Sequence, residues 1–399
     1  MQIYKSHVLK FLPGSYKFLY MSNKERQQKR FERDRKRRLE KRLQKEKDLC
    51  SYEKFASIDE LIRCFYKCKK GVGWKLSVQN YEISLFQNLS ESHKKLEVCL
   101  NVSKGYVTFY IWERGKRRKI QACHISERVV QKSFSENILA PMLEDTLIKN
   151  NCASQKGKGT SKAIQYFEED LKVAYKKYGR TFYIIQGDFH NYFASIQHDK
   201  LIDKLDKYFH DERTRWYYCS VINSFYEDGV NIGLGLGSQI CQHFAIFYAN
   251  ELDHYLEKLG KCGRFNDDFY LIVKTKEEAV EILNNIRVIV QDLGLELNEK
   301  KTHIIKATHT ITYLKTKFNL LDNGNIIKRP SRKAITRERK KLKKLKKKLD
   351  DGVITFSDVR NSYESWKGSL KGKKCYRTLQ NMNKLFNELF IEDWRLEYE

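Results

Sequence analysis

The stretch Arg264-Phe-Asn-Asp-Asp-Phe-Tyr-Leu-Ile-Val273 places two adjacent acids, Asp267 and Asp268, inside an otherwise apolar, strand-like run. A similar run about eighty residues earlier, Thr181-Phe-Tyr-Ile-Ile-Gln-Gly-Asp188, ends in a third acid. Burying carboxylates at the ends of hydrophobic strands costs free energy unless positive charge compensates for them. Divalent metal ions supply such charge, and two of them held by three acids are suited to phosphoryl transfer. The sequence therefore predicts a shared metal site.

A second acidic pair, Asp350-Asp351, serves as an internal comparison. It has charged neighbours and is followed by Gly352, a combination typical of a helix terminus. Asp267-Asp268 instead lies between Phe265 and a run of apolar residues, where folding alone does not require two acids. The surroundings of Asp267-Asp268, rather than the pair itself, indicate a functional site.

The net charge of the 399-residue chain is +27, from 77 Lys and Arg against 50 Asp and Glu. This excess predicts a polyanionic partner, of which nucleic acid is the usual one and a membrane surface the competing one. No apolar run approaches 18 residues, and we expect no membrane partner. Residues 1–20 lack the features of a signal peptide, and either Met1 or Met21 fits as the start.

The ten cysteines are scattered along the chain. Cys64 and Cys68 are spaced for one helix face, but no second Cys or His pair completes a zinc site, so we expect ordinary thiols. Unpaired cysteines are typical of a reducing compartment. The sequence therefore predicts a cytoplasmic location.

Composition divides the chain into three segments. Residues 1–104 are a basic helical N-terminal extension, in which 24–48 are almost entirely charged and contain no Gly or Pro. That stretch predicts a helix, either a solvated arm or a contact for nucleic acid or a partner. Residues 105–330 alternate strand and helix patterns, and 331–399 are helical and basic. Acids at strand ends within such alternation predict an α+β, palm-like core with a helical appendage.

Within the central segment the hydrophobic pattern predicts individual elements. Paired strands are expected at 106–112 and 118–125, and further strands around 303–328. The expected helices cover 127–149, 161–178, 199–226, 238–259 and 276–293.

Short motifs follow one another in order. Asp188-Phe-His-Asn-Tyr-Phe-Ala-Ser-Ile-Gln-His198 contains the first acid, and Gly233-Leu-Gly-Leu-Gly-Ser-Gln-Ile-Cys-Gln242 follows it. Phe265-Asn-Asp-Asp268, Leu295-Glu-Leu-Asn-Glu-Lys-Lys-Thr302 and Tyr313-Leu314 come next. Upstream lie Gly115-Lys-Arg-Arg-Lys-Ile120, Glu127-Arg-Val-Val-Gln131 and Lys156-Gly-Lys-Gly-Thr160. Together, over about 106–330, these motifs resemble the fingers and palm of bacterial reverse transcriptases.

The resemblance implies a right-hand polymerase fold, with fingers and palm at 105–330 and a basic helical thumb at 331–399. It implies RNA-directed DNA synthesis, a nucleotidyl transfer that uses dNTPs, an RNA template and a DNA or RNA primer. Similar stand-alone enzymes are of the retron, diversity-generating, group II-like or phage-defence-associated type. We expect a role in bacterial antiviral defence or a related retroelement, with a structured non-coding RNA, an accessory protein or an oligomer left open as partners.

The chain departs from the family pattern at four places. Gly235 replaces the usual Pro, Asn266 the usual small or Met residue, and Glu127 the usual Asp. None of these removes an expected metal ligand, so we expect activity to survive. The turn after Leu314 has Lys-Thr in place of Gly, which puts the primer-grip geometry in doubt.

For the metal site, the resemblance implies two Mg²⁺ ions, replaceable by Mn²⁺, bridged by Asp188 and Asp267. Asp268 would support the site from beside the ions, and Phe189 would lend its backbone carbonyl. Lys301 would donate a proton to pyrophosphate, although it fits equally well as a surface lysine.

For the nucleotide, Lys116 and Arg118 would hold the triphosphate, since a guanidinium fork suits phosphate oxygens. Phe193 lies where the family uses a bulky ring to exclude the ribose 2′-hydroxyl. Gly237 would let backbone approach the templating base pair, and Gln242 would line the same pocket. Each residue also has a competing interpretation. Lys116 and Arg118 would lie at a solvated hairpin tip, and Phe193 would be a plain core residue. Gly237 would be an ordinary turn glycine, and Gln242 would occupy a helix surface position.

For the template and primer, Lys156 and Lys158 flank glycines that expose backbone amides to phosphate. Lys341, Lys344 and Lys348 belong to a basic seam that would lie along the duplex as a thumb helix, although a solvated helix remains open. Aromatic residues beyond it, Tyr363, Trp366 and Tyr376, would either stack on nucleic acid or form the thumb core.

Two alternatives to template-directed synthesis remain. The same site would also serve protein-primed or template-independent DNA synthesis. A catalytically silent RNA-binding scaffold with a palm fold is the other, which the three intact acids disfavour.

Overall fold

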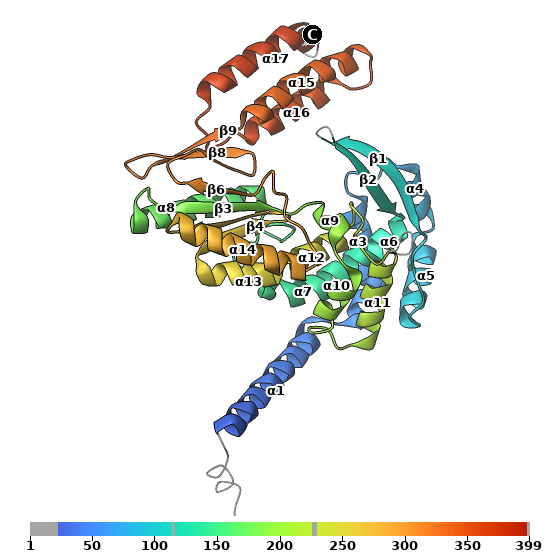
Figure 1. Ribbon diagram of the computed structural model, residues 1–399. Coiled ribbons are helices and arrows are strands. Elements are labelled where there is room, and N and C mark those ends of the chain that lie inside the picture. The colour runs from blue at the N-terminus through green and yellow to red at the C-terminus, as the bar shows by residue number, and fades with distance from the viewer. Residues whose placement is uncertain (1–22, 114–115, 226–229, 397–399) are drawn as a thin grey trace, which may run out of the picture. The chain divides into compact units, whose positions relative to one another are not determined.

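A computed structural model describes residues 23–113, 116–225 and 230–396, without the side chains of 23, 24, 113, 116 and 391–396 (Figure 1). The chain forms two compact units. The first contains the residues up to Asp145 together with His198–Asn231 and Gly235–Cys241. The second contains Thr146–Gln197, Ile232–Leu234 and the chain from Gln242 onward.

The first unit is mainly helical. The helix predicted for 24–48 is α1 (Asn23–Leu49), and the predicted hairpin is β1 (Tyr106–Glu113) paired antiparallel with β2 (Lys116–Cys123). The remaining helices before the hairpin are α2 (Tyr52–Ala56), α3 (Ile58–Lys69), α4 (Leu76–Ile83) and α5 (Leu85–Glu97). None of the helices that the structure describes combines the length and apolar character needed to cross a bilayer.

Two helices that the pattern predicted as continuous are interrupted in this unit. Residues 127–149 form α6 (Ile125–Phe134), a π-helical turn at Ser135–Leu139 and α7 (Ala140–Leu143). Residues 199–226 form α10 (His198–Leu205) and α11 (Glu212–Asn223). The second break arises because Asp211 caps α11, accepting the Thr214 N–H at 2.7 Å.

The second unit is built on a four-stranded antiparallel sheet in the order β4-β5-β3-β6. Its strands are β3 (Tyr183–Asp188), β4 (Lys261–Phe265), β5 (Asp268–Val273) and β6 (His303–Lys306). The helices are α8 (Thr160–Tyr178), α9 (Tyr192–Ser195), α13 (Asn250–Leu259) and α14 (Lys276–Asp292), and α12 (Gln239–Tyr248) begins in the first unit. The single helix predicted for 238–259 is thus two, α12 and α13.

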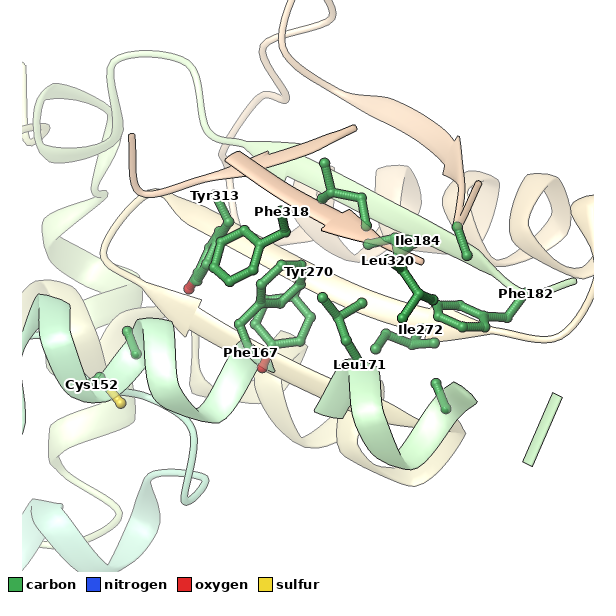
Figure 2. Close-up of a cluster of buried hydrophobic side chains, with 14 residues drawn as sticks. Cys152, Phe167, Leu171, Phe182, Ile184, Tyr270, Ile272, Tyr313, Phe318 and Leu320 are labelled. Atoms are coloured by element: carbon green, nitrogen blue, oxygen red, sulfur yellow. The ribbon is translucent and has the colours of Figure 1, made fainter. Parts of the chain in front are cut away.

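A second antiparallel sheet, in the order β7-β8-β9, shares a core with the first. Its strands are β7 (Ile311–Tyr313), β8 (Thr316–Leu320) and β9 (Ile326–Pro330). Figure 2 shows its buried side chains meeting one face of β3 and β5 and the inner face of α8. The core residues include Phe167, Leu171, Ile184, Tyr270, Ile272, Tyr313, Phe318 and Leu320. The strand that ends in Asp188 is therefore held in a rigid interior.

The turn between β7 and β8 is built without glycine. Leu314 has a φ of 44° and Lys315 a φ of 64°, so both adopt the left-handed conformation of a tight two-residue hairpin turn. The turn that the sequence put in doubt therefore closes, with the backbone strain that left-handed residues bearing a Cβ carry.

Three C-terminal helices complete the second unit: α15 (Arg332–Asp350), α16 (Phe356–Gly368) and α17 (Tyr376–Leu396). They share an apolar cluster that includes Leu342, Val359 and Met382. Tyr363 stacks on Phe386 within it, with ring centroids 4.4 Å apart.

Candidate active site

The three acids lie at neighbouring strand ends of the four-stranded sheet. Asp188, the last residue of β3, lies opposite Asp268, the first residue of β5. Asp267 belongs to the two-residue turn between β4 and β5, and its carbonyl accepts the Phe189 N–H at 3.1 Å. Asn266, the other turn residue, has a φ of 54°, which Asn tolerates better than most residues. The departure from the family pattern at this position thus suits the turn.

Asp188 is the most buried of the three, with 2% of its surface exposed. Lys301 Nζ lies 2.7 Å from its Oδ1 and 2.6 Å from its Oδ2, and Asn298 Nδ2 donates to Oδ1 at 3.1 Å. The contact with Asp188 raises the pKa of Lys301 although burial opposes it. Lys301 thus lies within ion-pair distance of Asp188, with 52% of its side chain exposed, and its role as a proton donor stays a prediction.

Burial and like charge both act on Asp268. Burial, followed by the neighbouring carboxylates of Asp267 and Asp188, raises the pKa of Asp268 to about 7. Lys301 opposes this shift only in part. The carboxylates of Asp188 and Asp267 are near enough to Asp268 to raise its pKa, although among the described residues the three acids do not bring one ligand atom each within 4.8 Å of one another. Together with Asn298 they offer oxygen ligands of the kind that hard divalent cations such as Mg²⁺ prefer.

A second cluster of possible metal ligands, Glu60, Cys64 and Glu136, is neutralised by cationic side chains of the protein. Among the described residues, the acids and thiol of Glu60, Cys64 and Glu136 are the group whose potential ligand atoms all lie within 4.8 Å of one another. Lys67 forms an ion pair with Glu136 at 2.6 Å, and Arg63 forms one with the same carboxylate at 2.7 Å. Arg63 also pairs with Glu60. Hydrogen bonds from Lys67 and other cations lower the pKa of Glu136 to about 2 although burial opposes this. These acids already have their counter-ions in the protein.

A buried ion pair holds the turn that carries Asp267. Arg264 on β4 is fully buried, and its Nε and Nη2 reach the two oxygens of Asp253 on α13 at 2.6 and 2.8 Å. The same guanidinium donates to the Asn266 carbonyl at 3.0 Å and to the Ile246 carbonyl at 2.5 Å. One side chain thus fixes the turn that carries Asp267 to two helices.

Two of the predicted nucleotide residues lie in the second unit with the acids. Phe193 on α9 is half-buried, packs edge-on against Tyr192, and its carbonyl accepts the Leu234 N–H at 2.8 Å. Tyr192 in turn stacks on Phe189, with ring centroids 4.8 Å apart. Gln242 is half-buried, and its Oε1 accepts a hydrogen bond from Ser154 at 3.3 Å.

The other predicted nucleotide residues lie in the first unit. Arg118 on β2 is half-buried opposite Ile111, while the side chain of Lys116 falls outside the described part. Gly237 has a φ of 112°, a left-handed value that favours glycine, and an added Cβ would lie 3.6 Å from Ile120.

Two departures from the family pattern have local explanations in the first unit. At Gly235, an added Cβ would approach the Phe225 ring to 2.3 Å, which explains why Pro is absent there. Glu127 is buried and accepts hydrogen bonds from Ser103 at 2.9 Å and Gln131 at 2.9 Å. Burial raises the pKa of Glu127. Both residues therefore serve the local packing and hydrogen bonding of this unit.

The predicted template residues differ in exposure. Lys156 is exposed, whereas Lys158 Nζ donates to the carbonyls of Lys149 and Asn151 at 3.1 and 3.2 Å. Lys158 thus has a structural role in its own loop. On α15 the predicted lysines, Lys341, Lys344 and Lys348, are exposed on the side away from the buried Leu342.

The C-terminal aromatics separate into two classes. Tyr363 is buried and stacks with Trp366 at 5.7 Å between ring centroids, so both belong to the core of the three helices. Tyr376 is 74% exposed. Only Tyr376 of the three is placed to stack on a ligand.

The sequence was compared with known families and structures. A model of the family "Reverse transcriptase (RNA-dependent DNA polymerase)" matches residues 103–318, more than half of the chain. The chain belongs to the reverse transcriptase family. Its α+β palm with antiparallel sheets agrees with that membership.

Two telomerase structures are similar to the chain at low identity. Telomerase from Candida albicans, in complex with the TWJ fragment of telomeric RNA, is 12% identical with a TM-score of 0.43, over 72% of this chain and 59% of that one. Apo telomerase from Candida tropicalis, truncated from the C-terminal domain, is 14% identical with a TM-score of 0.43, over 56% and 55%. The chain thus spans less than two thirds of either telomerase. No curated protein matches its sequence.

In this reverse transcriptase fold, two residues of the site were missed as individual candidates. Asn298 holds Asp188 through both its side chain and its N–H, which donates to the Asp188 carbonyl at 2.7 Å. Asn298 belongs to the Leu295–Thr302 motif, and that motif could have identified it as a candidate. Arg264 precedes the acidic turn by two residues, and a cationic residue inside an apolar strand was its signal.

Proposed function

We propose that the chain synthesises DNA on an RNA template by two-metal-ion nucleotidyl transfer at Asp188 and Asp267. The observation that carries this proposal is the meeting of three carboxylates at the ends of β3 and β5, with the pKa of Asp268 raised to about 7 by burial and by its acidic neighbours. Ionising all three carboxylates is unfavourable because they repel one another, and a bound divalent cation would offset that repulsion.

Asp188 and Asp267 would hold two Mg²⁺ ions, with Mn²⁺ as a substitute and with Phe189 offering its carbonyl. When bound, such ions lower the pKa of a primer 3′-hydroxyl and neutralise the leaving pyrophosphate. Asp268 supports Asp188 from the opposite strand end. Lys301 Nζ lies within 2.7 Å of both Asp188 oxygens, and a departing pyrophosphate would compete with Asp188 for a proton of this ammonium group.

For the incoming dNTP, the proposal keeps the residues that the family resemblance implies. Arg118 and Lys116 would bind its triphosphate, and Gly237 and Gln242 would adjoin the templating pair. Phe193 would exclude the ribose 2′-hydroxyl. Phe193→Val is expected to raise ribonucleotide incorporation in primer extension, whereas a plain core role would lower stability and leave discrimination unchanged.

The proposal places the template–primer duplex along α15, the basic helix of a thumb. Exposed lysines that face away from a helix core contact phosphates without reading sequence. Replacing Lys341, Lys344 and Lys348 with Gln should lower the slope of log Kd against log salt by about 0.9 for each lost phosphate contact. The matched control replaces the exposed Lys54, Lys94 and Lys258, and an equal change there would contradict the placement.

Primer extension with purified protein tests the activity itself. Asp188→Asn or Asp267→Asn should lower the rate by about 10³ or more, beyond the 10–100-fold loss typical of outer-shell partners. Asp351→Asn, an exposed acid at the end of α15, should change nothing. Wild-type inactivity with every template, primer and divalent ion would reject the polymerase and favour a silent RNA-binding scaffold. Extension without template, or from a protein hydroxyl, would favour the template-independent or protein-primed alternative.

For the biological role we propose a bacterial enzyme of the defence-associated or retroelement type that acts in the cytoplasm. The ordered palm motifs and ten free cysteines support this proposal. A structured non-coding RNA or an accessory protein would be its partner. Sequencing the nucleic acid that copurifies with the protein would name the template, and plaque counts with and without Asp267→Asn test a defence role.

A further inference from the structure

The N-terminal helix α1 carries a charge excess that the polymerase site does not use. Its 27 residues include thirteen Lys and Arg against six Asp and Glu. Every residue from Gln27 to Lys41 is exposed. At a rise of 1.5 Å per residue, α1 is about 40 Å long.

Some cationic residues of α1 adjoin one another, although four acids between Glu25 and Glu40 lie among them and Arg33 makes an interaction of its own. Arg30 and Arg33 are three residues apart and Arg33 and Arg37 four apart, spacings at which side chains meet on a helix surface. Each like-charge pair at such spacing costs about 0.2–0.5 kcal/mol. A polyanion bound along the helix would convert this repulsion into attraction.

The C-terminal end of α1 is fixed to the first unit. The buried Glu46 accepts the N–H groups of His210 at 2.9 Å and Asp211 at 3.1 Å. Arg42 lies 4.7 Å above the Tyr208 ring and donates to the Lys207 carbonyl at 3.1 Å. A helix that served only solubility would need no such anchor, whereas an arm that presents a ligand to the body would.

The side chains of the exposed part favour phosphate over a lipid surface. Phe31 and Leu39, 68% and 44% exposed, are the large apolar residues between Gln27 and Lys41. Two such residues do not make the apolar face with which an interfacial helix enters a bilayer. Arginine predominates among the cations there, and its planar fork binds phosphate oxygens in pairs.

We infer that α1 is an anchored arm that binds the phosphate backbone of structured RNA, at a site separate from the one that copies the template. The choice of RNA rather than DNA rests on the proposed function, because the family acts on RNA. The charge, exposure and anchoring of α1 do not depend on it.

The test is fluorescence anisotropy with a labelled RNA stem-loop of about 20 base pairs that has no single-stranded overhang. The arm variant replaces five exposed arginines with Gln, a substitution that keeps helix propensity: Arg30, Arg33, Arg35, Arg37 and Arg38. The control variant removes the same charge from exposed lysines elsewhere: Lys54, Lys70, Lys94, Lys258 and Lys276. Both are compared with wild type in thermal melting and in primer extension on a short template–primer.

The arm variant should bind the stem-loop at least ~10-fold more weakly, with a salt slope lower by about 0.7–0.9 for each lost phosphate contact. The control variant should keep wild-type affinity, and extension of the short template–primer should be unchanged in both. Unchanged stem-loop binding by the arm variant would overturn the inference, as would an equal loss in the control. Tighter arm-dependent binding to a DNA hairpin of equal length would overturn the choice of RNA. Loss of primer extension in wild type would count against the polymerase alone, since stem-loop binding is measured separately.

Discussion

Replacing Asp268 with Asn should stabilise the metal-free protein at alkaline pH. Burial and the carboxylates of Asp267 and Asp188 raise the pKa of Asp268 from its ordinary 3.8 to about 7 in the folded state. Between these values the folded protein holds a proton that the unfolded chain lacks, so its stability falls as pH rises. Above pH 7 the ionised carboxylate lowers stability in full, and the amide of the variant avoids that loss because it does not ionise.

The magnitude follows from the difference between the two pKa values. About three pH units at about 1.4 kcal/mol each give roughly 4 kcal/mol as an upper bound. Water reaches the partly exposed carboxyl and screens it, so we expect Asp268→Asn to gain about 2–3 kcal/mol at pH 8. At pH 5 the wild-type protein has lost only a minor part of this stability, so Asp268→Asn should be more stable than wild type by about 1 kcal/mol.

Urea denaturation in EDTA at pH 5 and pH 8 measures both values. Asp351→Asn is the control, because this exposed acid has no acidic cluster around it. Adding Mg²⁺ at 100 times its Kd should stabilise wild type by about 2.7 kcal/mol and the variant by less. A wild-type-to-variant difference that is the same at pH 5 and pH 8 would refute the raised pKa of Asp268 in the folded state.

Three further substitutions test the framework of the site by thermal or urea denaturation. Gly187→Ala should cost about 1–3 kcal/mol, because its Cβ would lie 2.1 Å from the Phe269 ring, and Phe269→Leu should restore part of the loss; a neutral Gly187→Ala would contradict the packing. Lys315→Gly should raise stability by about 0.5–1 kcal/mol by relieving a left-handed φ of 64°, and a loss would show that the turn is unstrained. Tyr363→Ala should cost about 3 kcal/mol and Tyr376→Ala almost nothing, because only the former is buried; equal effects would argue against the assignment of Tyr363 to the core.

The local hydrophobic pattern was enough to predict the palm strands and the acids at their ends. The strand ending in Asp188 and the hairpin around Asp267 were legible because apolar runs and the acids that interrupt them are local in sequence. The opposition of Asp188 and Asp268 depends on strand pairing over about eighty residues, and the charge argument and the family resemblance were what anticipated that these acids meet.

The misjudged features depend partly on contacts between distant parts of the chain. The helix predicted for 199–226 ends before α11, where Asp211 provides a local cap and Glu46 also accepts the N–H groups of His210 and Asp211 from 164 and 165 residues away. Lys301 could be assigned as a proton donor from its motif, but its ion pair with Asp188 spans 113 residues. A single sequence carries no local trace of such contacts.

The pairing of Arg264 with Asp253 limits how the sequence of this chain can diverge. Removing either partner alone leaves the other as an uncompensated buried charge, which typically costs about 3–5 kcal/mol. An apolar pair of similar volume could take their place only through an intermediate that loses much of the fold's stability. Sequence drift in α13 is therefore coupled to the strand before the catalytic turn, and the two positions should change together or not at all.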